Sequence, residues 1–233
     1  MTTETGATTE RRAPLSRERV LAAAVELADR EGIDALSMRR LGTELGVEAM
    51  SLYNHVANKE DVLDGMVDVI LSEIDPAPKA GEWKARLRKR ILSARRVMLR
   101  HRWASGVIVS RSQASPAMMS YMDGVAGIFL QGGFSVDLLH HAMHVLGSRI
   151  LGFSQELFDD SNELVQSPEM QALMLQQMSA AYPNITEIVR QVQHDEASVV
   201  GAGCDDQREF EFALDLLLDG LERRRASQTT AGG

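Results

Sequence analysis

The sequence predicts an all-α protein. Apolar residues recur three and four positions apart along most of the chain, which is the spacing of one buried face of a helix. Alanine, leucine, methionine, glutamate and arginine are frequent, and these residues lose little rotamer freedom in a helix. Aromatic residues make up only 5% of the chain, and β-branched residues form no alternating runs. With 44% hydrophobic residues, the chain can bury a sizeable core.

Composition also limits the expected cellular location and partners of the protein. No apolar run reaches the length of about 18 residues that spans a membrane, so no membrane partner is expected. The first fifteen residues are polar and do not resemble a secretory signal. A single cysteine, Cys204, cannot form an internal disulfide, which favours a reducing, cytoplasmic location. The net charge of −8 excludes little, because a DNA-binding protein needs positive charge on one surface only.

The first part of the chain predicts a disordered arm (1–14) and a small helical domain (15–75). Ser16 and Ser37 are expected to cap the first two helices, which end at Gly32 and Gly46. A very short helix should cover 49–55, and Asn58 should cap a long linking helix over 58–75. Pro76, Pro78 and Gly81 then mark a domain boundary.

The rest of the chain predicts longer helices in a second domain (80–225). We expect helices over 82–102, 104–110, 115–130, 135–158 and 208–225, and a further helix that begins at the Ser167-Pro168-Glu169 cap. The stretch 195–206 contains two glycines and little periodicity, which predicts a loop. The tail 226–233 is expected to be disordered.

The segment 37–56 is typical of a helix-turn-helix. Two short helices would meet at Gly46, because glycine adopts the left-handed backbone that a tight helix–helix turn requires. Apolar residues would pack the two helices together, while the second helix presents small or hydrogen-bonding side chains outward. A plain helical corner has the same spacing. Two observations favour DNA instead. Tyr53 and His55 would be costly to leave exposed without a partner, and Lys59 at the start of the next helix suits a phosphate.

Residues 16–70 resemble the DNA-binding domain of the tetracycline-repressor (TetR) family. The resemblance is carried by Gly46-Val47-Glu48, Ser51-Leu52-Tyr53-Asn54-His55-Val56 and Asn58-Lys59. It implies a three-helix DNA-binding domain in which Tyr53 and Lys59 hold phosphates and Ser37 and His55 help to fix the backbone. The residues facing base edges would be Arg39, Ala49, Met50 and Ser51, with Arg39 able to read a guanine.

The C-terminal part resembles the tetracycline-repressor subgroup, through 131–135 and 210–222. In that family the last helix and the helix beginning at Ser135 pair with their copies across a twofold axis. The last helix is apolar around much of its circumference, as expected of a helix covered on two sides. A homodimer interface is therefore predicted at Phe210, Leu214, Leu217 and Leu221, although a central helix of a monomer would show the same pattern.

A pocket for a small hydrophobic effector is predicted on two helices, because Met-rich walls suit a flat, apolar ligand. The resemblance places Met122, Val125, His140, Met143 and Glu156 there, and the same helix faces carry Met118, Phe129 and His144. Ordinary core is the alternative for each residue. Gly106-Val107-Ile108-Val109-Ser110 contains no histidine where tetracycline-responsive members bind drug-bound magnesium, so another inducer is expected.

We expect no bound metal, no cofactor and no enzymatic activity. His140 and His144 have a spacing compatible with zinc, but no third ligand follows at a fixed interval. A metal-carboxylate bundle enzyme needs paired Glu-x-x-His motifs, which the chain lacks. The many basic residues of 82–102 indicate a solvated face. Arg90 or Arg95 is a candidate for contact with an acidic effector.

Together these features predict a transcriptional repressor. It would bind a palindromic operator in double-stranded DNA as a homodimer and be released by a small effector. The alternative on the same fold is a ligand-independent or activating DNA-binding regulator.

Overall fold

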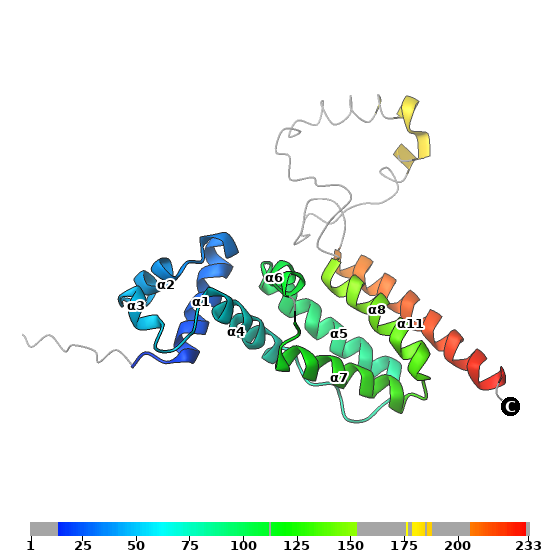
Figure 1. Ribbon diagram of the computed structural model, residues 1–233. Helices are drawn as coiled ribbons and strands as arrows, with labels where there is room; N and C mark the ends of the chain where they lie inside the picture. Colours follow the sequence, from blue (N-terminus) through cyan, green and yellow to red (C-terminus); the bar gives the residue numbers. More distant parts are fainter. Residues whose placement is uncertain are drawn as a thin grey trace, which may run out of the picture. The chain divides into compact units, whose positions relative to one another are not determined.

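The computed structural model describes residues 14–111, 113–152, 176, 179–184, 186–187 and 206–231. Within these ranges the regular structure is helical and contains no β-strand (Figure 1), which confirms the predicted all-α fold. The chain divides into two compact units, one formed by the residues up to Ala80 with Lys89–Gly127, the other by Gly81–Arg88 with the residues from Ile128 onward. None of the described helices is both long and apolar enough to traverse a lipid bilayer.

The N-terminal helices begin at the capping residues that the sequence predicts. The side chains of Ser16, Ser37 and Asn58 accept hydrogen bonds from backbone N–H groups three residues ahead, at 3.3, 3.1 and 2.8 Å. Gly32 and Gly46 end their helices with φ of 84° and 68°. The resulting elements are α1 (Arg17–Glu31), a 3₁₀ turn (Ile33–Ala35), α2 (Met38–Leu45), α3 (Ala49–Leu52) and α4 (Lys59–Ser72).

The first unit has one continuous core. Leu27 of α1 and Met66 and Ile70 of α4 are fully buried in it. The same core includes Val97 of α5 (Trp83–Arg100) and Val107 of α6 (Ala104–Ser110), and side chains from the start of α7 (Pro116–Gln131) pack against it. The helix that links the two predicted domains, α4, thus shares one core with α1, α5, α6 and α7.

A buried polar network joins three parts of this unit. His101, 3% exposed at the end of α5, places Nδ1 2.8 Å from a carboxylate oxygen of Asp29 in α1. Its Nε2 lies 3.3 Å from Oε2 of Glu73, directly after α4. The indole N–H of Trp103 also donates to Asp29, at 2.7 Å. Because buried polar groups are costly unless they are paired, this network fixes how α1, α4 and the α5–α6 junction pack together.

The second unit is built around three aromatic rings. Trp83 and Phe134 lie edge to face with their centroids 4.7 Å apart, and Phe129 packs against both rings. Helix α8 (Val136–Gly152) and helix α11 (Asp206–Ala231) run side by side (Figure 1). In α11 the buried residues are Phe210, Leu214 and Leu218.

The basic face predicted to be solvated is paired with acidic side chains. In the second unit, Arg88 bonds to Asp215 at 2.8 Å and to Glu211 at 2.7 Å, and Lys84 pairs with Asp219. In the first unit, Arg90 donates to the carbonyls of Ile74 and Asp75, and Arg96 and Arg100 pair with Asp75 and Glu73. These basic residues thus form ion pairs at the surface, where the side chains of Arg96 and Arg100 are 61 and 64% exposed, and Arg90 is held at the end of α4.

Two helix ends differ from the prediction. Helix α3 stops at Leu52, and the backbone continues as turns to His55. The last helix continues past Arg225 to Ala231, where a disordered tail was expected. Arg225 donates to the carbonyl of Gly132 at 2.7 Å, and Ser135 donates to Gln228 at 3.0 Å, so tertiary contacts hold this extension. Residues 1–13 of the predicted arm 1–14, most of the helix expected from Ser167 and most of the loop 195–206 lie outside the described residues.

Candidate nucleic-acid interface

The turn between α2 and α3 is set by two glycines. Gly46 has φ 68° and ψ 36°, the left-handed conformation, and its N–H closes α2 on Thr43 and Gly42. A Cβ atom on Gly42 would lie 2.9 Å from the carbonyl oxygen of Val47, because the start of α3 passes close to α2. These glycines let the two short helices abut, as the predicted helix-turn-helix requires.

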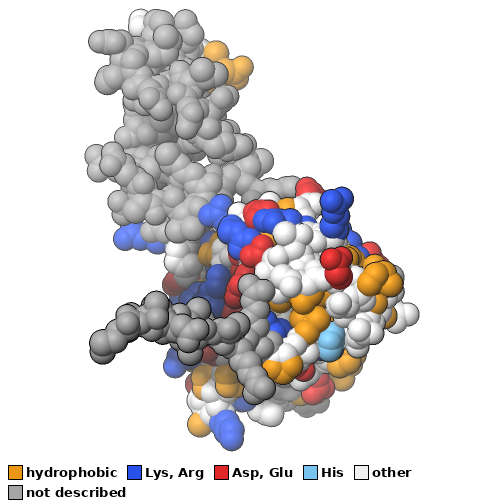
Figure 2. Space-filling model, turned by 90° about the vertical axis from the view of Figure 1, so that its left-hand side faces the viewer, with side chains coloured by type: hydrophobic (Ala, Val, Ile, Leu, Met, Phe, Trp, Pro, Cys, Tyr) orange, Lys and Arg blue, Asp and Glu red, His pale blue; other side chains and the backbone are white. Residues whose placement is uncertain are grey.

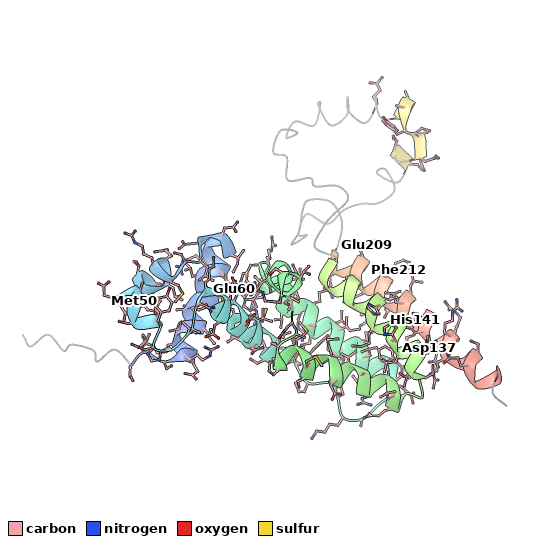
Figure 3. All side chains as sticks on the ribbon, viewed as in Figure 1. Met50, Glu60, Asp137, His141, Glu209 and Phe212 are labelled. Atoms are coloured by element: carbon pink, nitrogen blue, oxygen red, sulfur yellow. The ribbon has the colours of Figure 1, made fainter. Side chains whose placement is uncertain are left out.

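Helix α3 is held from one side and exposed on the other. Leu52 is fully buried and Val56 is 3% exposed, so the apolar side of this segment is anchored in the core. On the outer side Met50 is 75% exposed and Tyr53 is 45% exposed. Figure 3 labels Met50 on α3, and Figure 2, which faces that side of the molecule, shows hydrophobic side chains exposed there.

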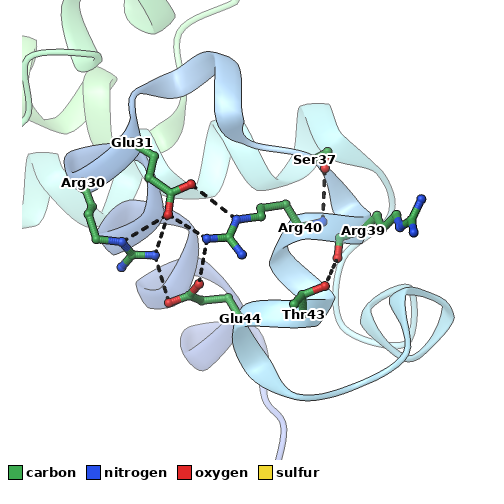
Figure 4. Close-up of polar contacts among 7 residues, drawn as sticks. All are labelled: Arg30, Glu31, Ser37, Arg39, Arg40, Thr43 and Glu44. Atoms are coloured by element: carbon green, nitrogen blue, oxygen red, sulfur yellow. Dashed lines mark hydrogen bonds and ion pairs between the residues drawn. The ribbon is translucent and has the colours of Figure 1, made fainter.

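Arg39 is separated from the other arginines around it. Arg40 contacts Glu31 at 2.7 Å, and Arg30 contacts Glu44 at 3.0 Å, which ties the end of α1 to α2. Figure 4 shows these pairs, with the guanidinium of Arg39 pointing away from them. The carbonyl of Arg39 accepts a hydrogen bond from Thr43 at 3.1 Å, so its backbone is part of the helix while its side chain is exposed.

Asp61 connects three elements next to α3. Its carboxylate receives two hydrogen bonds from Arg17 of α1, at 2.8 and 2.6 Å, and one from the N–H of Ala57 at 2.8 Å. The hydrogen bond from Arg17 is the main cause that lowers the pKa of Asp61 below its usual value. Arg17 also donates to the carbonyl of His55 at 3.3 Å. The turn that follows α3 is thereby fixed to α1 and to the first turn of α4.

The residues predicted to contact DNA all lie on α2, on α3 and its following turn, or at the start of α4. Ser37, Arg39, Met50, Tyr53 and Lys59 are exposed, and Ala49, Ser51 and His55 are half-buried. Ser37 is also the N-cap of α2. Sequence reasoning missed the bridge from Arg17 to Asp61. The position of Asp61 three residues after the Asn58 cap, in an acidic first helical turn, was the available signal.

The predicted effector residues fall in both units. Met122 (40% exposed) and Val125 (5%) belong to α7 in the first unit. In the second unit Phe129 is fully buried with Trp83 and Phe134, Met143 is half-buried, and His140 and His144 are exposed on α8 with ring centroids 4.6 Å apart. Glu156 lies outside the described residues. Among the residues described, no three potential metal-ligating side chains come together.

The predicted dimer residues lie on two sides of α11. Phe210 and Leu214 are buried within the chain itself, whereas Leu217 and Leu221 are half-buried. The outward apolar residues of this helix are Phe212 (64% exposed) and Leu216 (53%). Figure 3 labels Phe212 on α11 and Asp137 and His141 on α8. A groove of about 400 Å³ between these helices is lined by Asp137, Leu138, His141, Val145, Leu221, Arg224, Ser227 and Gln228.

Comparison with known proteins places this arrangement in a family. The family described as "Bacterial regulatory proteins, tetR family" matches residues 20–66, and "Tetracyclin repressor-like, C-terminal domain" matches residues 75–225. An HTH-type transcriptional regulator of Saccharopolyspora erythraea is 36% identical over 121 residues, which cover 52% of this chain and 51% of that protein. The class D tetracycline repressor protein of Escherichia coli is 29% identical over 213 residues, 90% of each chain.

A solved structure agrees over nearly the whole length. Apo ActR from Streptomyces coelicolor has a TM-score of 0.70 and 26% identity, covering 93% of this chain and 99% of its own. ActR in complex with actinorhodin has a TM-score of 0.67 and 26% identity, covering 91% and 99%. The second family match covers more than half of the chain, and the first covers the helix-turn-helix. The chain therefore belongs to the TetR family of bacterial transcriptional regulators.

Proposed function

We propose that this protein is a repressor that binds a palindromic operator as a homodimer and is released by a small hydrophobic effector. The observation that carries the proposal is the exposed side of α3, flanked by Arg39 on α2 and Lys59 at the start of α4. An exposed short helix that is anchored through one buried leucine has the form that enters a major groove.

Each side chain has a role that its chemistry suits. Lys59 begins α4, where its own charge and the helix N-terminus both attract a phosphate. Tyr53 can donate its hydroxyl to a second phosphate. Ser37 accepts a hydrogen bond from Arg40, which leaves its hydroxyl hydrogen available for the DNA backbone. Arg39 is the candidate for bidentate contact with a guanine.

A second copy of the chain is the proposed occupant of the outer face of α8 and α11. Val136, Val145, Phe212 and Leu216 expose between 42 and 73% of their surface, and Val145 also lines the groove between the helices. A twofold dimer would cover these residues and would supply two recognition helices for the two half-sites of a palindrome. Leu217 and Leu221 are the predicted interface residues that remain partly accessible for it.

For the effector, α7 of the first unit adds a residue to the predicted set. The hydroxyl of Tyr121 is buried and has no hydrogen-bond partner among the described residues, while the guanidinium of Arg90 lies 4.8 Å from its ring centroid. Burial raises the pKa of Tyr121 to about 12, so the group is a neutral donor. A ligand with an acceptor oxygen would accept a hydrogen bond from the Tyr121 hydroxyl. The same ligand would make the predicted apolar contacts with Met122 and Val125.

DNA binding is tested with the full chain and the DNA that flanks its own gene. We expect the protein to sediment as a dimer and to bind one palindromic fragment of this DNA. Lys59→Ala and Tyr53→Phe should weaken binding to every fragment, and Lys59→Ala should also make the salt dependence shallower by about one phosphate contact. Lys79→Ala removes the same charge from an exposed site outside the interface and should leave binding unchanged. Equal effects of Lys59→Ala and Lys79→Ala would contradict the proposed interface.

Effector control is tested on the same complex. Footprints are recorded with a library of aromatic and aliphatic compounds, with actinorhodin included because ActR has been solved with it. We expect at least one compound to remove the footprint of the wild-type protein. A footprint that persists with all compounds and with extracts of the host would reject release by a ligand and would favour the ligand-independent regulator.

A further inference from the structure

Met50 is the most exposed large hydrophobic side chain among the described residues, at 75%. Single exposed apolar residues are common, so exposure alone identifies no site. The position of Met50 is informative. It is the second residue of α3, while its neighbours Ala49 and Ser51 have short side chains and are half-buried. Met50 is therefore the long apolar side chain that is exposed at the start of α3, where Figure 3 labels it.

The chemistry of methionine restricts which base edge it can face. Its thioether donates no hydrogen bond and accepts only weakly, so it cannot pair with the donors and acceptors of guanine, adenine or cytosine. A polar base edge pressed against it would lose water without gaining a partner, which is unfavourable. In the major groove thymine alone of the four bases presents a methyl group, and apolar side chains contact that methyl.

We infer that Met50 is a specificity-determining residue that selects an A·T base pair by packing against the thymine methyl group. The inference rests on the proposed DNA-binding function and names part of its target sequence. Each half-site of the operator then contains one thymine whose methyl contributes to affinity. Arg39, on α2, would read a different base pair.

The expected effect follows from one buried methyl group, which corresponds to about a fourfold change in affinity. A palindromic operator has two half-sites, so a dimer would make the contact between Met50 and a thymine methyl twice. Loss of the methyl from one half-site should therefore weaken binding about fourfold, and loss from both half-sites about fifteenfold.

The experiment removes single methyl groups from the DNA. A binding fragment is selected from random duplex DNA with the full chain, and each thymine is replaced in turn by deoxyuridine, which lacks only that methyl. Dissociation constants are measured by fluorescence anisotropy for the wild type, Met50→Ala and Met119→Ala. Met119 is 56% exposed on α7, away from the interface, and provides a matched control.

We expect one thymine per half-site to be sensitive in the wild type and in Met119→Ala, and insensitive in Met50→Ala. The inference is overturned if no thymine is sensitive in the wild type, or if Met50→Ala keeps the sensitivity. The wild-type series needs no variant, so the absence of a sensitive thymine overturns the inference even if Met50→Ala folds poorly, whereas assigning a sensitive thymine to Met50 requires the folded variant. Failure to select any fragment would instead reject DNA binding itself, which Lys59→Ala tests separately.

Discussion

The bridge between Arg17 and Asp61 should stabilise the DNA-binding helices measurably. It consists of two charge-assisted hydrogen bonds in a bidentate geometry, at 2.8 and 2.6 Å, and the same carboxylate accepts the N–H of Ala57. Hydrogen bonds to charged groups contribute about 1.5–3 kcal/mol when they are shielded from water. The side chains are 42 and 29% exposed, and exposed ion pairs contribute only about 0.2–1 kcal/mol. We therefore expect a coupling free energy of about 1 kcal/mol.

A double-mutant cycle measures this coupling. Urea unfolding at pH 7 is followed for the wild type, Arg17→Met, Asp61→Ala and the double variant, and the interaction is the part of the loss that is not additive. The pair Arg96–Asp75 provides the control, since its side chains are 61 and 68% exposed and joined at one distance of 2.7 Å. Its coupling should stay near zero, at most about 0.5 kcal/mol.

The pH dependence of the coupling free energy provides an independent test of whether ionised Asp61 stabilises the folded protein. Because Arg17 lowers the pKa of Asp61 in the folded protein, the contribution is complete above the unfolded pKa of about 3.9 and is lost as pH falls through the folded pKa. The cycle should thus give a smaller coupling near pH 3 than at pH 7. A coupling below about 0.3 kcal/mol at pH 7, or one equal to that of Arg96–Asp75, would refute the reasoning.

Two further substitutions test how α3 is held. Leu52→Ala should lower the free energy of unfolding by about 2–5 kcal/mol, because Leu52 is fully buried; a loss below 1 kcal/mol in urea unfolding would contradict its anchoring role. Gly46→Ala should cost about 1–2 kcal/mol, since alanine is strained at φ 68°, whereas Gly46→Asn should cost less. An equal or smaller cost for alanine, measured by the same method, would argue against a left-handed turn there.

The helix-turn-helix could be predicted because its signals are local. Ser16, Ser37 and Asn58 each cap a helix through a hydrogen bond to a residue three positions ahead, so a short window of sequence contains both partners. Gly46 needs only its own backbone conformation. The end of α3 was less predictable, since His55 continues the helical spacing, but its carbonyl accepts from Arg17, far away in the sequence.

The role of the basic residues of α5 could not be predicted from a short window. Arg88 pairs with Asp215, 127 residues away, and Lys84 with Asp219, 135 residues away. Taken alone, a helix with many arginines resembles a solvated surface. A signal existed in the spacing of Glu211, Asp215 and Asp219, which form an acidic stripe at four-residue intervals that complements the basic one.

The last helix shows why a face can be predicted more easily than its partner. A helix apolar on two sides must be covered on two sides, and α11 has a buried row with Phe210 and Leu214 and an exposed row with Phe212 and Leu216. The sequence pattern does not indicate which row packs against the other helices of the same chain. The intrachain contacts of Phe210 and Leu214 decide this, and they leave Phe212 and Leu216 as the row that a second chain would cover. The same distinction applies to α3, where Leu52 faces the core and Met50, two residues earlier, faces outward. In both helices the surface that we propose to be functional is the apolar side that the chain's own core leaves uncovered.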